Sequence, residues 1–111
     1  NISVVCELEK EDINLQTLET IEMFEPFGVA NPQPVFLTRK MLLEDIRSVG
    51  AAGEHLKLQA DGFSAIAFRM GEKRALLRPG YLVDLVYNIS EDRYSGNGAL
   101  QLKIKDLNLS S

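Results

Sequence analysis

Two residue types that carry much of enzyme chemistry are scarce in this 111-residue chain, which contains one cysteine, Cys6, and one histidine, His55. A single cysteine cannot form an internal disulfide, and one cysteine with one histidine cannot build a Cys/His zinc site. The sequence motifs of zinc proteases, serine hydrolases, P-loop NTPases and calcium-binding loops are also missing. Nucleophilic or metal-dependent catalysis by this chain alone is therefore not expected.

Long apolar runs are missing as well. No run approaches the roughly 20 residues that a membrane helix needs, and no signal-peptide pattern is present. The composition, 45% hydrophobic and 25% charged, is typical of one globular domain. Because a lone Cys6 fits a reducing compartment, we expect a cytoplasmic protein with no membrane partner. The chain begins at Asn1 rather than methionine, and we expect it to be a piece of a longer protein.

Charge is distributed unevenly along the chain. The formal net charge of −4 by itself disfavours a nucleic-acid partner. Residues 1–38 contain seven acids and one base, a sum of −6, whereas residues 39–111 contain eleven bases and nine acids, a sum of +2. A solvated acidic helix face explains the first part. The same asymmetry leaves the second part able to face a polyanion.

Residues 1–34 are interpreted as a leading segment with a short strand, one α-helix and a proline-rich connector. The alternation in residues 2–8 predicts the strand and indicates that Cys6 is a small buried hydrophobe. Asn14 is the expected N-cap of a helix over residues 12–24 that packs on the next domain. Three prolines and a glycine exclude regular structure from residues 25–36, where Phe27 and Phe36 are expected to pack against the domain.

Residues 35–111 are interpreted as a β-rich domain. Apolar alternation predicts strands near residues 35–49, 55–59, 63–70, 81–89 and 100–105, with helix–strand ambiguity at 41–45 and one or two helical turns at 71–77. The dipeptides at 61–62 and 97–98 are hairpin signals. Three strands, a short helix and two strands follow the order of the OB-fold. We therefore predict a mainly β protein: a five-stranded OB-fold, a Greek-key barrel, preceded by a short strand and one α-helix.

The hairpin after residue 60 allows two registers. A two-residue turn pairs Ala60 with Phe63 and leaves Phe68 exposed as a stacking platform. A three-residue loop pairs Ala60 with Ser64 and gives a core face of Leu56, Leu58, Ile66 and Phe68. The Asp-Gly dipeptide favours the first register. Because the second buries the large apolar side chains together, it is the one we predict.

Five segments resemble the RecJ family, in the family's order and spacing. The most specific is PFGVANPQPVF at residues 26–36, and the others are HLKL at 55–58, AIAF at 65–68, VDLVY at 83–87 and LQLKIKD at 100–106. RecJ proteins are single-stranded-DNA-specific 5′→3′ exonucleases of DNA repair and recombination. The resemblance implies the OB-type domain that follows the catalytic region, with single-stranded DNA and the catalytic domains of the same chain as partners. It implies manganese or magnesium in the parent enzyme, bound by motifs that this chain lacks, and no cofactor here.

OB-folds typically bind oligonucleotides on their second and third strands and the adjoining loops. Single strands are held there by cations along the backbone and by flat side chains under the bases. We predict weak, sequence-independent contact with single-stranded DNA through His55, Lys57, Arg69, Arg93, Tyr94, Lys103 and Lys105. His55 and Lys57 face outward in both hairpin registers. A two-residue turn at 97–98 would instead place Lys103 opposite Asp92 in a surface ion pair.

Three classes of function compete. The outward cations favour a DNA-binding domain. The net charge of −4 favours a structural OB module that braces neighbouring domains or recruits a protein, and OB-folds serve unrelated tasks. An independent enzyme is disfavoured by the missing motifs. One contiguous basic stripe would support DNA binding, whereas scattered lysines would support bracing.

Overall fold

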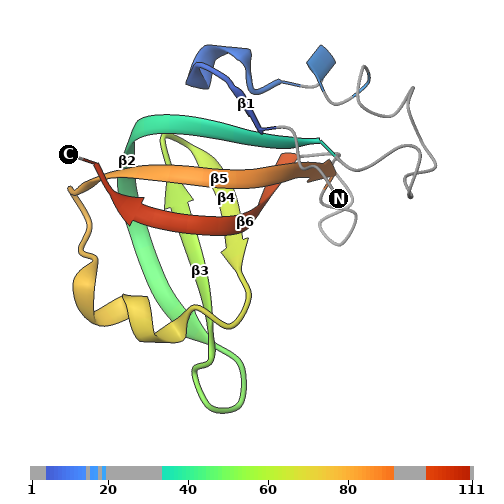
Figure 1. Cartoon of the computed structure of the whole chain (residues 1–111). Helices are drawn as coiled ribbons and strands as arrows, with labels where there is room; N and C mark the ends of the chain where they lie inside the picture. Colours follow the sequence, from blue (N-terminus) through green and yellow to red (C-terminus); the bar gives the residue numbers. More distant parts are fainter. Residues whose placement is uncertain (1–4, 15, 18, 20–33, 92–99, 111) are drawn as a thin grey trace.

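The computed structural model describes residues 5–14, 16–17, 19, 34–91 and 100–110 (Figure 1). Its elements in chain order are β1 (Val5–Glu7), the 3-10 helix η1 (Lys10–Asp12), β2 (Val35–Val49), β3 (His55–Ala60), β4 (Phe63–Ala67), the 3-10 helix η2 (Gly71–Leu76), β5 (Leu82–Glu91) and β6 (Leu100–Leu109). Within the described residues, no helix has the length and apolar character to cross a membrane.

The strands β2 to β6 close into a barrel. The strand order is β1-β2-β3-β4-β6-β5, and β2 also pairs with β5, which closes the ring. The β4–β6 pair is parallel, and the other pairs of the ring are antiparallel. With η2 between the third and fourth barrel strands, this is the predicted OB-fold topology. In Figure 1, β5 and β6 pass in front of β3 and β4.

The ambiguous region at residues 41–45 is part of the long strand β2. Two register shifts, between Thr38 and Met41 and between Leu43 and Asp45, interrupt the regular alternation that identifies a strand. Lys40 at the first shift has a φ of 57°. These bulges bend β2 so that its first half pairs with β5 and its second half with β3.

The barrel interior is filled by apolar side chains from all five strands, and its largest fully buried members include Met41, Leu56, Tyr87 and Leu102. The Tyr87 and Thr38 hydroxyls hydrogen-bond to each other at 2.7 Å. Burial raises the pKa of Tyr87, and the bond to Thr38 offsets part of that rise. Phe36 is buried with its ring centroid 6.1 Å from that of Tyr87, which confirms that it packs against the domain. Phe27 lies outside the described residues.

The β3–β4 hairpin has the register that we did not predict. Ala60 pairs with Phe63 across a two-residue turn, and Asp61 and Gly62 have φ angles of 47° and 84°. Positive φ at both central residues defines the type I′ turn, which asparagine, aspartate and glycine favour. The alternative with Ser64 opposite Ala60 is therefore wrong.

Turn chemistry and the barrel's limited space explain this register. The Asp61 carboxylate accepts the Leu42 N–H at 2.8 Å, and the Glu44 carboxylate accepts the Gly62 N–H at 2.6 Å, so the turn is bonded to the bulged part of β2. On β4 the core positions are Ala65 and Ala67, both fully buried. With alanine at both of these positions, Ile66 and Phe68 lie on the outer face, whereas Phe63 at the start of the strand packs against the core.

The leading segment contacts the barrel through β1 and Ile13. β1 pairs in parallel with the start of β2, and Ile13 is buried in the core. Cys6 is exposed, so its predicted burial is wrong, because β1 lies at the sheet edge outside the barrel. The Asn14 side chain accepts the Thr17 N–H at 2.9 Å, as expected for an N-cap. Residues 16, 17 and 19 are α-helical. Residues 15, 18 and 20–24 of the helix predicted for residues 12–24, and most of the connector, lie outside the described residues. The domain boundary at residue 34 stays a prediction.

The last hairpin also differs from expectation. Lys103 lies opposite Asn88 rather than Asp92, and Gln101 lies opposite Ser90. The connection spans residues 92–99, so a two-residue turn at 97–98 does not set the register. The register that would place Lys103 opposite Asp92 is therefore wrong, and Asp92 itself lies outside the described residues.

Candidate nucleic-acid interface

Four side chains line up across the outside of the barrel, one from each of four adjacent strands. Arg47 on β2 lies opposite Lys57 on β3, Lys57 opposite Ile66 on β4, and Ile66 beside Lys103 on β6. Arg47, Lys57 and Lys103 are exposed, and we call these three residues the basic row. Because neighbouring strands are roughly 4.8 Å apart, Lys57 and Lys103 lie about 10 Å apart at the backbone, on either side of β4.

The centre of this face, along β4, is apolar. Ile66 is partly buried, and Phe68, which directly follows the strand, is 53% exposed. We call Ile66 and Phe68 the β4 ridge. Cations flank the ridge from β3 and β6. This combination suits single-stranded nucleic acid, whose phosphates attract cations and whose bases stack on flat apolar side chains.

His55, Phe68 and Arg69 form a cluster where β4 ends. The rings of His55 and Phe68 meet edge to face, with centroids 5.2 Å apart and planes at 76°. His55 Nδ1 accepts the backbone N–H of Arg69 at 2.9 Å. Arg69 has a φ of 61°, in the left-handed region that non-glycine residues seldom adopt. The bond to His55 therefore supports an otherwise disfavoured backbone and leaves the Arg69 side chain exposed beside Phe68.

The remaining predicted residues separate into two groups. Lys105 is exposed, but it sits at a β-bulge, because Tyr87 pairs with Ile104 and Val86 with Asp106. The bulge changes the direction of β6 at this point. Lys105 therefore lies on the outside of the barrel beyond Lys103, but not in line with the basic row. Arg93 and Tyr94 lie outside the described residues.

The cations of this face have few acidic partners. Arg47 bonds to the Asp45 carboxylate at 3.0 Å, and this hydrogen bond is the main reason that the pKa of Asp45 is lowered. Among the described residues, no ion pair involves Lys57, Arg69 or Lys103. Like charges on neighbouring strands repel each other. A bound polyanion would relieve that repulsion.

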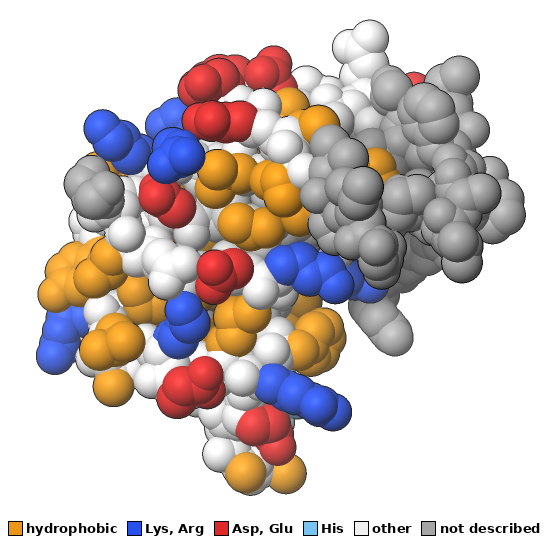
Figure 2. All heavy atoms as spheres, in the orientation of Figure 1, with side chains coloured by type: hydrophobic (Ala, Val, Ile, Leu, Met, Phe, Trp, Pro, Cys, Tyr) orange, Lys and Arg blue, Asp and Glu red, His pale blue; other side chains and the backbone are white. Residues whose placement is uncertain are grey.

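The β5 and β6 side of the barrel has a mixed surface. Figure 2 looks onto the β5 and β6 side, where lysine and arginine side chains are interspersed with acidic and hydrophobic ones. No single sign of charge dominates the described residues in that view. The basic row, by contrast, is defined by the pairing of β2, β3, β4 and β6.

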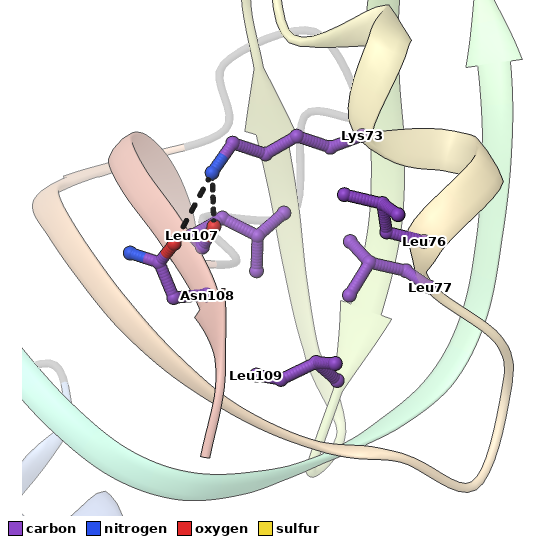
Figure 3. A pocket seen from close by; sticks show the side chains of 6 residues that line it. All are labelled: Lys73, Leu76, Leu77, Leu107, Asn108 and Leu109. Carbon is purple, nitrogen blue, oxygen red and sulfur yellow. Dashed lines mark hydrogen bonds between the residues drawn. The ribbon is translucent and has the colours of Figure 1, made fainter. Parts of the chain in front are cut away.

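An apolar hollow of about 200 Å³ lies between η2 and the end of β6 (Figure 3). Its lining residues are Lys73, Leu76, Leu77, Leu107, Asn108 and Leu109. Lys73 Nζ donates to the Leu107 carbonyl at 2.6 Å and to the Asn108 side-chain oxygen at 3.3 Å. Because Lys73 is bonded across the hollow in this way, it ties η2 to β6 rather than offering a free cation.

Metal-ligating groups do not gather in the described part of the chain. No cluster of three or more His, Cys, Asp or Glu residues there could hold a metal ion. These residues therefore do not fit the manganese or magnesium implied for a parent enzyme. The expectation about cofactors stays a prediction.

Sequence reasoning missed Arg47 and assigned Ile66 and Phe68 to the core face. Arg47 is recognised only through its cross-strand position opposite Lys57. Ile66 and Phe68 look like core residues by hydrophobicity, whereas the Asp61-Gly62 turn places them outside. The dipeptide was the signal that could have identified them.

The barrel topology and this basic, partly apolar face define an OB-fold domain suited to a polyanion. The model of the RecJ OB domain family matches residues 5–106, and the chain belongs to this family. The resemblance found in the sequence is thereby confirmed.

Two relatives illustrate the match. The chain is 30% identical over 109 residues to the single-stranded-DNA-specific exonuclease RecJ of Bacillus subtilis (strain 168), which covers 95% of this chain and 14% of that protein. The crystal structure of RecJ from Thermus thermophilus in complex with Mn²⁺ aligns with a TM-score of 0.75 and 25% identity, covering 99% of this chain and 16% of that one. This chain therefore spans about a seventh of the curated relative's length.

A third likeness shows the fold alone. A putative aspartyl-tRNA synthetase from Leishmania major Friedlin aligns with a TM-score of 0.60 at 11% identity, over 100% of this chain and 22% of that one. OB-folds serve unrelated proteins, so a function for this chain must be argued from its own face.

Proposed function

We propose that this chain is the single-stranded-DNA-binding domain of a cytoplasmic, RecJ-like 5′→3′ exonuclease and holds the strand for a catalytic domain outside these 111 residues. The observation that carries the proposal is the basic row flanking the β4 ridge, with Lys57 and Lys103 free of ion pairs within the described residues. Family membership supports it. The Bacillus subtilis relative is named for single-stranded DNA.

The chemistry of the face favours binding without base recognition. Lysine and arginine neutralise phosphates and release condensed counterions, which makes affinity depend on salt. The ridge is apolar and offers base faces a surface but no hydrogen-bond pattern to read base edges. In this proposal the domain binds the strand, while any divalent metal and the hydrolysis belong to the catalytic domain.

The acidic leading segment limits affinity. Residues 1–38 carry a sum of −6 and repel a polyanion through the overall field. Weak binding by the isolated chain is therefore expected. In the parent protein the same segment would serve as a docking element for the catalytic domains, its second proposed partner.

The competing proposal is a bracing module. It is favoured by the exposed leucines near η2, since Leu76 is 67% and Leu109 50% exposed beside the apolar hollow. A neighbouring domain could cover them. This role is compatible with DNA binding on the other face, but it becomes the primary function if the chain does not bind DNA.

A fluorescence-anisotropy titration with oligo-dT at low salt tests the proposal. Lys57→Gln removes one charge from the basic row, and Lys40→Gln removes the same charge from an exposed residue where β2 pairs with β5. With about three phosphate contacts, log K should fall against log salt with a slope of roughly −2, at about −0.7 per contact. We expect Lys57→Gln to weaken binding and reduce that slope, and Lys40→Gln to behave like the wild type.

Two results would overturn the proposal. Equal effects of the two substitutions would mean that only the net charge matters and that this face is not the interface. An absence of binding by the wild type, even at low salt, would leave the bracing role as the function of the chain.

A further inference from the structure

Phe68 is the most conspicuous apolar side chain on the candidate interface. It is 53% exposed, whereas Ala67 before it is fully buried. Its position follows from the hairpin register, which places Ala65 and Ala67 in the core and Ile66 and Phe68 on the outer face. The exposed half of the ring adds nothing to folding stability, because it is in contact with water in the folded and the unfolded chain alike, and it is available to a ligand.

The surroundings of Phe68 hold it in place. Before it, Ala67 pairs with Leu56 on β3. After it, the Gly71 N–H bonds to the Glu54 carbonyl at 3.0 Å. A Cβ at Gly71 would lie 2.3 Å from the Gly53 carbonyl oxygen, so the chain is pressed against the β2–β3 loop. The backbone on both sides of Phe68 is therefore fixed.

The ring itself is also supported. His55 meets it edge to face, with a 5.2 Å centroid separation, and His55 is in turn bonded to the Arg69 N–H. One neighbouring ring can cover at most one face of Phe68, and the 53% exposure leaves the remainder of the ring open to solvent. A preorganised aromatic face loses little conformational freedom when a planar ligand stacks on it.

We propose that Phe68 is a stacking platform for one nucleobase of the bound single strand. This inference rests on the proposed function and adds the contact that distinguishes bases from phosphates. Arg69 beside the ring and Lys57 on the adjacent strand are placed to contact the phosphates next to that base. Because every base has a π-face, the platform is indifferent to sequence.

The test compares oligo-dT with an abasic oligomer of the same length and phosphate count, using the whole 111-residue chain. Stacking on an aromatic ring is worth about 1–3 kcal/mol per base, so Phe68→Ala should weaken oligo-dT binding by roughly fivefold or more. It should leave the weaker abasic binding, and the salt slope for both ligands, within about twofold of wild type. Tyr81→Ala removes another exposed aromatic ring, 40% exposed between η2 and β5, and should change neither affinity.

The tryptophan fluorescence of a second variant reports stacking directly. The chain contains no tryptophan, so Phe68→Trp introduces a lone indole at the platform. Its fluorescence should be quenched by oligo-dT and not by the abasic oligomer, with oligo-dT affinity retained. Phe68→Leu, which keeps an apolar side chain without a ring face, should lose affinity as Phe68→Ala does.

The possible outcomes distinguish failure of the Phe68 proposal from failure of the proposed function. If Phe68→Ala lowers the affinity for both oligomers equally, or lowers neither, Phe68 is not a stacking platform. Salt-dependent binding by the wild type would still support the proposed function in that case. An unquenched Phe68→Trp at saturating oligo-dT would overturn the platform too. If the wild type binds neither oligomer, the proposed function and the platform both fail.

Discussion

The register of the β3–β4 hairpin decides which residues form the candidate interface, and two substitutions can test it through stability. Ala67→Leu adds three carbons at a fully buried position, and Phe68→Ala removes a ring that is 53% exposed. In the observed register Ala67 faces the core and Phe68 faces outward. A one-residue slip would exchange their positions.

The expected magnitudes differ enough to separate the two registers. Burying a phenylalanine fully is worth about 1.5–3 kcal/mol, so a ring that is about half buried should cost about 1 kcal/mol when removed. Overpacking a core site with Ala67→Leu should cost about 1–3 kcal/mol or more. In the slipped register Phe68→Ala would cost about 3–5 kcal/mol, as core substitutions do, and Ala67→Leu would be nearly neutral. The order of the two effects is thereby reversed.

Urea denaturation followed by circular dichroism measures both effects. For two-state unfolding, the midpoint shift multiplied by the slope m gives the change in the free energy of unfolding, with m about 1–3 kcal/mol per molar urea. We expect Phe68→Ala to shift the midpoint less than Ala67→Leu does. A Phe68→Ala cost near 4 kcal/mol with a harmless Ala67→Leu would refute the register, and with it the exposed ridge.

Three further predictions concern the barrel itself. Gly71→Ala should lower the melting temperature, because its Cβ would meet a backbone oxygen at 2.3 Å, and an unchanged melting temperature would contradict that close approach. Tyr87→Phe and Thr38→Val should each cost about 1–3 kcal/mol by orphaning a buried hydroxyl, and the double variant should cost less than the sum in urea denaturation; strict additivity would argue against the bond. The Ser110 hydroxyl is the main group that lowers the pKa of Asp84. Because the folded-state pKa lies below the unfolded one, this stabilisation is present at neutral pH and is lost as the pH falls through the folded pKa. Asp84→Asn should therefore flatten the acid limb of unfolding free energy against pH, and an acid limb as steep as that of the wild type would show that this carboxyl contributes little.

The topology could be predicted from the sequence because strand order and turn chemistry are local signals. Alternation located the barrel strands, and the position of a short helical segment between the third and fourth identified the OB-fold. The ambiguity at 41–45 arose because the β2 bulges break the two-residue period, and Lys40 and Glu44 lie within them. A bulge depends on partner strands, which local patterns do not specify.

The candidate site was harder to predict because it depends on pairing. Lys57 was identified because it faces outward in either register, but Arg47 joins the row only through its position opposite Lys57. Hydrophobicity alone assigns Phe68 to the core. The turn residues Asp61 and Gly62 set the register instead, and it places Ala65 and Ala67 at the core positions. The predicted burial of Cys6 is wrong for a similar reason, because alternation alone does not show that a strand lies at an exposed sheet edge.

The central claim is that single-stranded DNA lies across the exterior of β3, β4 and β6. Backbone amide chemical shifts of the ¹⁵N-labelled chain during an oligo-dT titration test this claim most directly. We predict that the largest shifts cluster at Lys57, Ile66, Phe68 and Lys103 and that those of Leu76 and Leu109, beside the apolar hollow, stay small. Shifts concentrated around η2 and the end of β6, with the β4 ridge unaffected, would contradict the account.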